Sequence, residues 1–214
     1  MFKPGWFYFL SRSLKPISFN YGSNRGEPVD RYYIEKFLEE NKSLITGHCL
    51  EIENNTYTQK LGKNISKSDV LDINKDNAKA NIYADIRNLA EIPANTYDCL
   101  ILTQVLQFID DYDSAIKECH RVLKPGGAIL ATLPVMSRID ARSGPSGDFW
   151  RFTEASARYI FNNKHFASLE VRSWGNVLSG TAFWVGQAQE ELSKRELNYN
   201  DPNFPCIVTV KAVK

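Results

Sequence analysis

The chain contains few cysteines, and their spacing does not suit a metal ion. Three of the four fall within short apolar runs that are typical of strands. Isolated cysteines in such runs are usually small buried hydrophobic residues. We therefore expect no metal site and a reducing compartment, which favours the cytoplasm. The four residues are Cys49, Cys99, Cys119 and Cys206.

The chain also lacks an excess of charge of either sign. Lys and Arg number 26 against 25 Asp and Glu, so the formal net charge is +1. A protein whose main partner is DNA or RNA usually carries a basic surface. This balance argues against a nucleic acid as the main partner.

A long hydrophobic run is absent as well. Near the N-terminus the apolar stretch extends only from Gly5 to Leu10, which is too short for a signal peptide or a membrane span. We expect a cytoplasmic protein without an integral membrane segment, and leave self-association open. Aromatic and apolar side chains of this segment are expected to pack on the domain or on a partner subunit, with a peripheral membrane contact as the alternative; they are Phe2, Trp6, Phe7, Phe9 and Leu10.

What remains is an ordinary globular composition. The 214 residues are 43% hydrophobic and 24% charged, which is typical of a soluble domain. A chain of this length can bury a substantial core. We therefore expect one α/β domain with a few added elements.

The most regular stretch is residues 97–134, which has the pattern of strand, helix and strand. Cys99–Leu102 is a short apolar run with the length of a buried strand. Apolar residues then recur at helical spacing after Asp113, the expected N-cap. Lys124–Gly127 is predicted to end this helix before a second apolar run, Ala128–Leu133. This order of elements indicates a parallel sheet with a right-handed crossover.

Further elements are predicted on both sides of this unit. Helical patterns cover residues 32–41, 153–161 and 181–192, and strand patterns cover 169–173 and 206–213. The last strand is expected to be antiparallel to its neighbours.

The start of the first predicted helix concentrates charged and aromatic residues. Asp30 is its expected N-cap. The stretch from Arg25 to Tyr33 is rich in groups that can bind a polar substrate. Simple solvation of a charged helix start is the alternative.

Several of these phrases resemble a known family. A strand beginning at Tyr97-Asp98, the phrase VLQFIDD, and then HRVLKPGGAILATLP are similar to the fourth and fifth strands of class I S-adenosylmethionine-dependent methyltransferases. The resemblance covers residues 47–134. It implies an α/β fold with a doubly wound, mostly parallel seven-stranded sheet, which is a Rossmann-like methyltransferase fold, here with an N-terminal helical cap. It also implies S-adenosyl-L-methionine as the cofactor.

The resemblance divides the single domain, residues 1–214, into three parts. Residues 1–45 would form the N-terminal cap, 46–134 the cofactor-binding half, and 135–214 the acceptor-side half. Any other doubly wound fold with the same strand–helix–strand unit is the alternative.

The turn after the first predicted strand departs from the family pattern. Gly47–Ile52 resembles the family's first strand, with Glu51 as its acidic residue, but residues 53–58 contain no glycine. Asn54 or Asn55 is expected to adopt the left-handed conformation in its place. Glu53 would lie near the methionine end of the cofactor, where it either turns aside or pairs with the amino group. Glu51 and Glu53 are thus candidate cofactor-binding residues.

Other cofactor-binding residues follow from the resemblance at the ends of later strands. Asp72 would accept hydrogen bonds from the ribose hydroxyls, with Asn74, or a role in turn formation, as the alternative. Asp85 would accept from the adenine amino group, and Ile86 would lie against the ring. Gln104 would lie under the cofactor.

The acceptor side has weaker signals. Many relatives carry a histidine where this chain has Gln107, so one candidate base is missing. The long loop after the fifth strand ends in the phrase Asp148–Thr153, which is shared in kind by methyltransferases of glycans and small molecules. We predict Asp148 as the base and Arg151 as the group that orients the acceptor.

Together these residues predict a transferase, a methyltransferase that acts on a hydroxyl of a small-molecule or glycan acceptor. The alternative is a degenerate, non-catalytic protein of the same fold that serves as a binding or assembly partner. The glycine-free turn and the missing histidine favour the alternative, whereas the retained Asp72 and Asp85 favour the enzyme. A nicotinamide-dependent dehydrogenase is a distant third, since its glycine fingerprint is also absent.

Overall fold

The computed structural model describes residues 13–140, 143–144, 147–162 and 166–214. The apolar and aromatic residues between Gly5 and Leu10, and Phe2, lie outside this part of the chain. Seven strands form one sheet in the order β3-β2-β1-β4-β5-β7-β6. The predicted doubly wound, mostly parallel seven-stranded sheet is confirmed.

The strands run parallel except for β7, which lies antiparallel between β5 and β6. The predicted antiparallel last strand is therefore confirmed. The strand bounds are β1 Gly47–Ile52, β2 Ile65–Asp72, β3 Ile82–Tyr83, β4 Tyr97–Thr103, β5 Leu123–Pro134, β6 Ser168–Trp174 and β7 Ile207–Val213.

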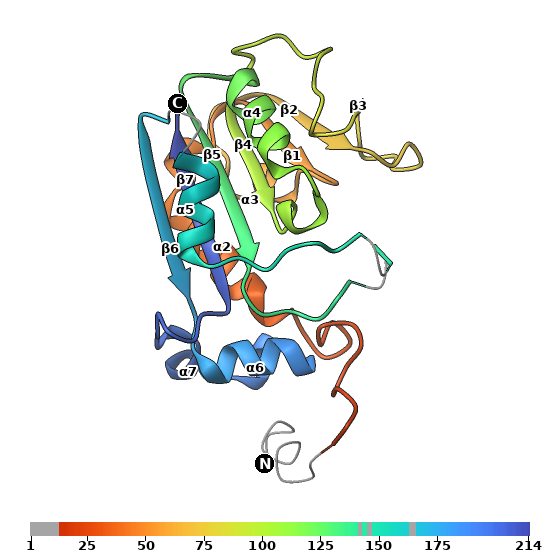
Figure 1. The fold of residues 1–214 in the computed structure, drawn as a ribbon, viewed down its shortest axis with the longest axis vertical. Helices are drawn as coiled ribbons and strands as arrows, with labels where there is room; N and C mark the ends of the chain where they lie inside the picture. The colour runs from red at the N-terminus through yellow and green to blue at the C-terminus, as the bar shows by residue number, and fades with distance from the viewer. Residues whose placement is uncertain (1–12, 141–142, 145–146, 163–165) are drawn as a thin grey trace.

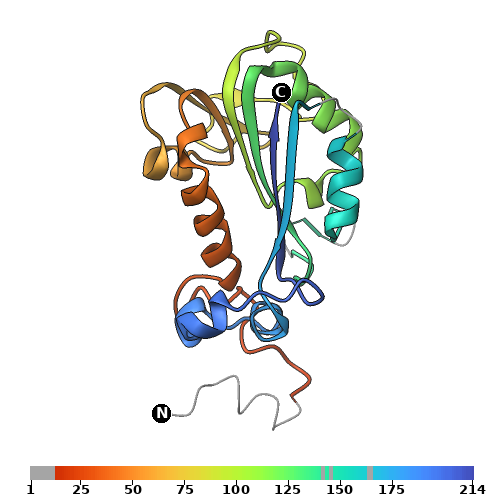
Figure 2. The ribbon, with the colours of Figure 1, turned by 90° about the vertical axis from the view of Figure 1, so that its left-hand side faces the viewer.

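Helices cover both faces of the sheet (Figures 1 and 2). One face carries α4 and α5, and the other carries α2, with α6 and α7 beside it toward the end where β5 finishes. The helix bounds are α2 Val29–Glu40, α3 Thr56–Leu61, α4 Tyr112–Val122, α5 Glu154–Asn162, α6 Val177–Val185 and α7 Lys194–Asn198. Short 3-10 turns lie at Lys42–Leu44, Leu106–Phe108 and Gln189–Glu191.

The core is split by the sheet into two hydrophobic layers. Because side chains alternate along a strand, Leu100 and Leu102 pack under α4 and α5, whereas Cys99 and Ile101 pack under α2 and α6. All four are fully buried. Complete burial on both faces explains why β4 has a continuous apolar sequence.

Two predicted N-caps are wrong by a short distance. The cap of α4 is Asp111, whose side chain accepts from the Ser114 N–H, and Asp113 lies in the first turn. The residue before α2 is Pro28, which provides no side-chain cap, and Asp30 lies inside the helix. Both helices begin earlier than predicted: Asp111 caps the first turn of α4, and the buried Val29 fixes the first turn of α2 in the core.

The helical pattern predicted over residues 181–192 also needs correction. The helix α6 begins earlier, at Val177, where Asn176 and Ser179 form a capping box. It ends at Gly186, which has φ +79°. Such a left-handed residue closes a helix and costs least as glycine.

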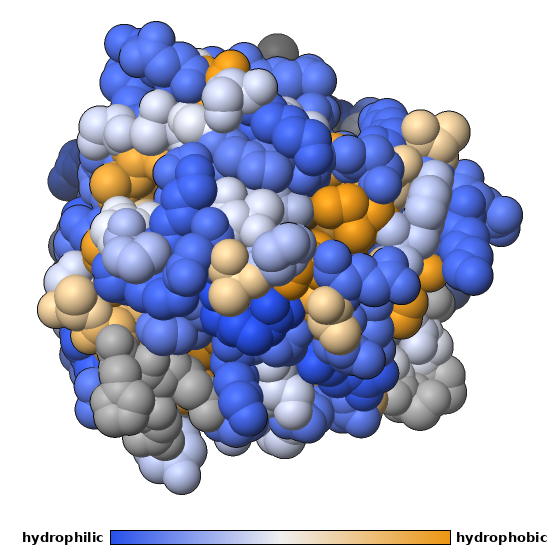
Figure 3. All heavy atoms as spheres, turned by 90° about the horizontal axis from the view of Figure 1, so that it is seen from above, coloured by the Kyte–Doolittle hydropathy of each residue, from blue (hydrophilic) through white to orange (hydrophobic). Residues whose placement is uncertain are grey.

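Figure 3 looks onto the end of the molecule at which the parallel strands begin. This face is mainly hydrophilic, with small and separate hydrophobic spots. Within the described ranges, no helix is long and apolar enough to cross a membrane.

A polar cluster ties three neighbouring strands together near the end of the sheet at which they begin. The Asp69 carboxylate on β2 lies 2.6 Å from His48 Nε2 on β1 and accepts from the Tyr97 hydroxyl on β4 at 3.2 Å. It also accepts from Asn81 Nδ2 and Lys67 Nζ. Burial raises the pKa of Asp69, but these hydrogen bonds outweigh burial and hold the pKa below its usual value.

We predict that Asp69→Asn lowers the free energy of unfolding at pH 7 by about 2 kcal/mol, because several donors lose their charged acceptor. A lowered pKa in the folded state stabilises above the unfolded pKa of about 4, and that stabilisation is lost as the pH falls through the folded pKa. Denaturant unfolding at several pH values should show the difference shrink below about pH 4. The exposed Asp76→Asn is the control, and an equal loss at every pH would contradict the electrostatic account.

Candidate functional site

A large cavity lies at the carboxyl ends of the parallel strands, where ligands bind in doubly wound folds. Its volume is about 1490 Å³, which exceeds the roughly 300–1,000 Å³ of a pocket for one small molecule. The cavity therefore has room for two ligands. Its walls come from the N-terminal segment, α2, the ends of β1, β2 and β4, and the loop after β5.

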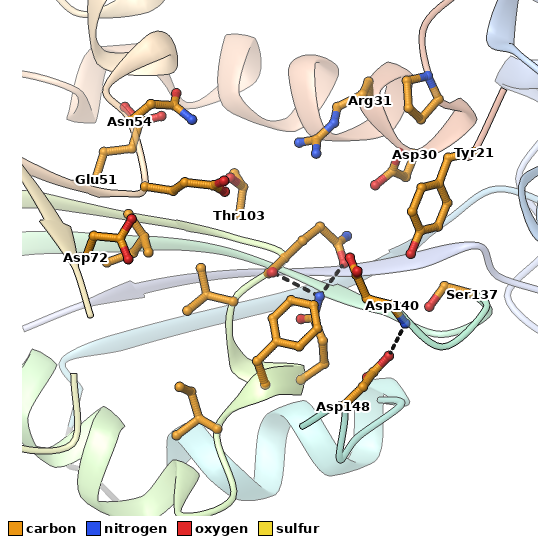
Figure 4. A pocket seen from close by; sticks show the side chains of 18 of the residues that line it. Tyr21, Asp30, Arg31, Glu51, Asn54, Asp72, Thr103, Ser137, Asp140 and Asp148 are labelled. Atoms are coloured by element: carbon orange, nitrogen blue, oxygen red, sulfur yellow. Dashed lines mark hydrogen bonds between the residues drawn. The ribbon is translucent and has the colours of Figure 1, made fainter. Parts of the chain in front are cut away.

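The cavity has two polar ends (Figure 4). Glu51, Asn54 and Asp72 lie at one end, near the carboxyl ends of β1 and β2. Tyr21 and Asp140 lie at the other end, beside the start of α2 and the loop after β5. We call these the strand end and the loop end of the cavity.

Glu51 is a buried residue that organises the strand end. Its carboxylate accepts from the backbone N–H groups of Tyr57 and Thr58 and from the Thr58 hydroxyl. Burial raises its pKa, and these three hydrogen bonds oppose the increase. The carboxylate thus holds the first turn of α3 against β1, so an effect of Glu51 on a ligand is exerted through the position of this turn.

Glu53 itself makes the turn after β1. Its φ is +68°, whereas neither Asn54 nor Asn55 has a positive φ, so the expectation that an asparagine would be the left-handed residue is wrong. The Glu53 carbonyl accepts from Asn77 Nδ2 at 2.7 Å. Tertiary contacts of the backbone therefore impose this conformation on a residue for which it costs about 1–2 kcal/mol.

The ends of β2 and β3 bring together the next predicted residues. Asp72 accepts from the Asn74 N–H and from Asn77 Nδ2, the latter at 2.6 Å. Asp85 accepts from the Arg87 guanidinium at both carboxylate oxygens, and this pairing lowers its pKa. Both acidic residues line the cavity.

Ile86 and Gln104 also line the cavity. Ile86 is 6% exposed and belongs to the core under α4, so only an edge of its side chain can touch a ligand. Gln104 has φ +56°, and its N–H bonds to β5 at Thr132. Gln107 Nε2 donates to the Gln104 carbonyl at 2.9 Å.

The two residues predicted for the acceptor are paired with each other. Arg151 donates to both oxygens of Asp148, at 2.6 and 3.0 Å, and to the carbonyls of Ser137 and Arg138. Asp148 also accepts from the Asp140 N–H. Burial raises the pKa of Asp148, but the Arg151 and Asp140 contacts outweigh it and lower the pKa. The pair braces the loop after β5, and its predicted catalytic roles stay predictions.

Sequence reasoning did not single out three residues of the loop end. Tyr21 stacks under the Arg138 guanidinium, 4.0 Å from the ring centroid, and Asp140 is 6% exposed. All three line the cavity. They come from irregular segments without hydrophobic periodicity, so only the charged helix start near Asp30 and Arg31 signalled this end in the sequence.

Unsatisfied polar atoms gather in this cavity. Among the described residues, five buried side-chain atoms have no hydrogen-bond partner, and four of their residues line the cavity. Buried polar atoms are normally paired, so such a concentration indicates a binding site for a polar ligand. The four atoms are Asp30 Oδ1, Gln104 Nε2, Gln107 Oε1 and Arg138 Nε.

Known proteins are similar to parts of this chain in sequence. A family described as "Methyltransferase domain" matches residues 46–131, which include the strand end of the cavity. Among curated proteins, a ubiquinone/menaquinone biosynthesis C-methyltransferase from Haemophilus ducreyi is 47% identical over 36 residues. That match covers 17% of this chain and 14% of the relative, so the chain spans only a small part of the curated proteins that it matches.

Solved structures share the fold over nearly the whole chain. A SAM-dependent methyltransferase from Archaeoglobus fulgidus is 12% identical with a TM-score of 0.58, covering 86% of this chain and 94% of that protein. One from Mesorhizobium loti is 16% identical with a TM-score of 0.56, covering 87% and 98%. The [4+2]-cyclase SpnF is 18% identical with a TM-score of 0.59, covering 98% and 94%. At such identities these likenesses establish the fold alone.

We predict that Glu53→Gly stabilises the protein by about 1 kcal/mol, because glycine adopts a positive φ without strain. Chemical denaturation measures this gain. Binding of S-adenosylhomocysteine should be unchanged or several-fold tighter, since a negative charge near the cofactor's carboxylate is removed. Asn64→Gly is the control, because Asn64 has φ +53° before β2, at the opposite end of the strands. Weaker binding by Glu53→Gly alone would show that the Glu53 carboxylate holds the cofactor.

Proposed function

We propose that the chain is a class I S-adenosylmethionine-dependent methyltransferase, as the match of residues 46–131 to a methyltransferase domain supports, and that it transfers a methyl group to a hydroxyl of a small-molecule or glycan acceptor. One observation carries the proposal: a cavity large enough for two ligands lies at the carboxyl ends of the strands, with the side chains of Asp72 and Asp85 in its lining. When bound, S-adenosylmethionine supplies an activated methyl group on a sulfonium.

The strand end suits the cofactor. The Asp72 carboxylate, held by Asn77, would accept hydrogen bonds from the ribose hydroxyls. Asp85, fixed by Arg87, would accept from the adenine amino group, and the exposed edge of Ile86 would touch the ring. The unsatisfied Nε2 of Gln104 would donate to the cofactor or to the acceptor next to it.

Arg31 would compensate for the absence of glycine from the turn after β1. Its guanidinium donates to the Tyr57 hydroxyl at 3.2 Å and lines the cavity; Figure 4 shows it directed into the space between the two ends. A cation there would attract the methionine carboxylate and counter the charge of Glu53. Glu51 would support the same region by fixing the start of α3.

At the loop end, the acceptor would lie against the loop after β5. Arg151 would orient the acceptor by holding this loop through the carbonyls of Ser137 and Arg138, and Asp148, the base predicted from the sequence, would hold Arg151 in place. The ion pair lowers the basicity of Asp148, so its contribution to proton removal would be small.

A second candidate function is a non-catalytic binding role on the same fold. The observation that favours it is Glu53, whose left-handed backbone takes the place of a glycine and whose side chain lines the cavity. In that case the Glu53 carboxylate would occupy the space of the methionine end. Direct titration separates the two functions.

We predict that S-adenosylhomocysteine and S-adenosylmethionine bind the parent protein with micromolar dissociation constants in calorimetric titration. Asp72→Ala should weaken binding about 5- to 150-fold, because hydrogen bonds to a charged acceptor worth about 1–3 kcal/mol are lost. Asp76→Ala, in the exposed loop after β2, is the matched control. No binding by the parent at millimolar concentration would overturn the enzyme and leave the non-catalytic function.

A further inference from the structure

Asp30 is a buried carboxylate that the fold does not explain. It lies in the first turn of α2 and is 4% exposed. Its Oδ1 has no hydrogen-bond partner among the described residues. Burying an ionisable group without a partner for each oxygen destabilises the folded state, so a purely structural role would favour a neutral side chain here.

The carboxylate is directed into the cavity. Figure 4 shows Asp30 turned toward the loop end, with Tyr21 beside it and Asp140 on the opposite wall. All three residues line the cavity. An acceptor bound in the loop end would therefore lie next to the Asp30 carboxylate.

The surroundings of Asp30 suit proton removal better than those of Asp148. Burial raises the pKa of Asp30, and the Arg31 charge and N–H only partly reverse the increase. Asp148 instead is held in its bidentate pair with Arg151, which lowers its pKa. A catalytic base is most effective when its pKa is closer to neutrality and its oxygen is free to contact the acceptor.

The other buried atoms without hydrogen-bond partners indicate what kind of methyl acceptor fits the cavity. Gln107 Oε1 can only accept, whereas Gln104 Nε2 and Arg138 Nε can only donate. The bond from Gln107 Nε2 to the Gln104 carbonyl sets the orientation of the Gln107 amide. A hydroxyl group both donates and accepts, so a ligand with several neighbouring hydroxyls would satisfy donors and acceptors together.

The charged side chains at the loop end narrow the chemical class of the methyl acceptor further. Asp30 and Asp140 are both buried at the loop end, where the Arg138 guanidinium lies over the Tyr21 ring, so a negatively charged acceptor would meet two acidic side chains as well as this guanidinium. Like charges at close range in a poorly solvated site repel strongly. A neutral molecule is the better match.

We propose that Asp30 is the catalytic base and that the acceptor is a neutral polyol of the sugar class. This inference rests on the proposed methyltransferase function. In the transfer, the acceptor O–H bond breaks and its proton moves to the Asp30 carboxylate. The oxygen forms a bond to the methyl carbon, and the carbon–sulfur bond breaks with its electron pair left on sulfur. The products are the methyl ether, S-adenosylhomocysteine and protonated Asp30.

The test uses the full chain with neutral methyl glycosides as probes: the methyl α-glycosides of D-glucose, D-galactose, D-mannose and L-rhamnose. Glucuronic acid is the anionic counterpart. Binding is measured by ligand-observed NMR in the presence of saturating S-adenosylhomocysteine, and turnover by formation of S-adenosylhomocysteine from S-adenosylmethionine. The variants are Asp30→Asn, Asp30→Ala and, as the control on the far end of α2, Glu39→Gln.

We expect at least one neutral glycoside to bind at least tenfold more tightly than glucuronic acid and to be methylated by the parent. Asp30→Asn keeps a hydrogen-bond acceptor but cannot take a proton, so it should bind the glycoside within threefold and turn over about 10²- to 10⁴-fold more slowly. Asp30→Ala should lose glycoside binding as well. Both variants should bind S-adenosylhomocysteine within twofold of the parent, and Glu39→Gln should match the parent throughout.

Thermal unfolding at pH 7 separates a catalytic role of Asp30 from a structural one. A structural role would lower the melting temperature of the variant, whereas a catalytic role would not. Burial outweighs the attraction of Asp30 to Arg31, and its Oδ1 has no hydrogen-bond partner among the described residues, so removing this charge should leave the melting temperature of Asp30→Asn equal to that of the parent or higher. A lower melting temperature together with weaker S-adenosylhomocysteine binding would assign Asp30 to the fold and overturn the proposal.

Each remaining outcome also decides for or against one part of the proposal. Turnover by Asp30→Asn within threefold of the parent overturns the base, and so does a glycoside that binds the parent without being methylated. Failure of every neutral glycoside to bind, or tighter binding of glucuronic acid, overturns the acceptor class. A parent protein that does not bind S-adenosylhomocysteine instead overturns the proposed function, which separates that failure from the failure of this inference.

Discussion

The site depends on the parallel pairing of β1, β2 and β4 with β5. Parallel strands end at the same edge of the sheet, so the polar residues that follow each strand meet there although they are far apart in the chain. Complete burial of β4 on both faces fixes its position, and with it the turn that carries Gln104 and Gln107. The cavity is therefore a consequence of sheet topology, and its walls are supplied by the segments that connect the strands.

The turn after β1 shows how tertiary contacts can hold a conformation that the local sequence disfavours. Glu53 adopts a left-handed conformation while Asn77 binds its carbonyl and Asp72 together. Glu51, two residues earlier, holds the start of α3 through three hydrogen bonds. Acidic residues thus build this turn, and the strain of about 1–2 kcal/mol is concentrated beside the cavity.

The loop end shows the complementary pattern, in which polar groups are buried without being satisfied. Asp30, Gln107 and Arg138 each carry an atom without a partner, although each contacts the same cavity. Asp148 and Arg151, in contrast, satisfy each other and brace the loop. The loop end thus contains two sets of polar residues: one set pairs internally and holds the wall of the cavity, and the other carries buried atoms without hydrogen-bond partners in the described part of the chain.

Short-range patterns in the sequence determined the elements and their order. The apolar runs of β4 and β5 and the glycine pair between α4 and the main part of β5 were sufficient to predict a parallel sheet, because strand length, helical periodicity and chain reversal are local properties. The caps at Asp111 and Pro28 differ from the predicted ones, since the side-chain cap of α4 and the burial of Val29 in the first turn of α2 form only in the folded chain. The left-handed residue at Glu53, the pairing of Asp148 with Arg151, and the meeting of Tyr21 and Asp30 with Asp140 were decided only by the tertiary structure. Each depends on segments brought together by the sheet, and no periodicity in the chain records such a contact.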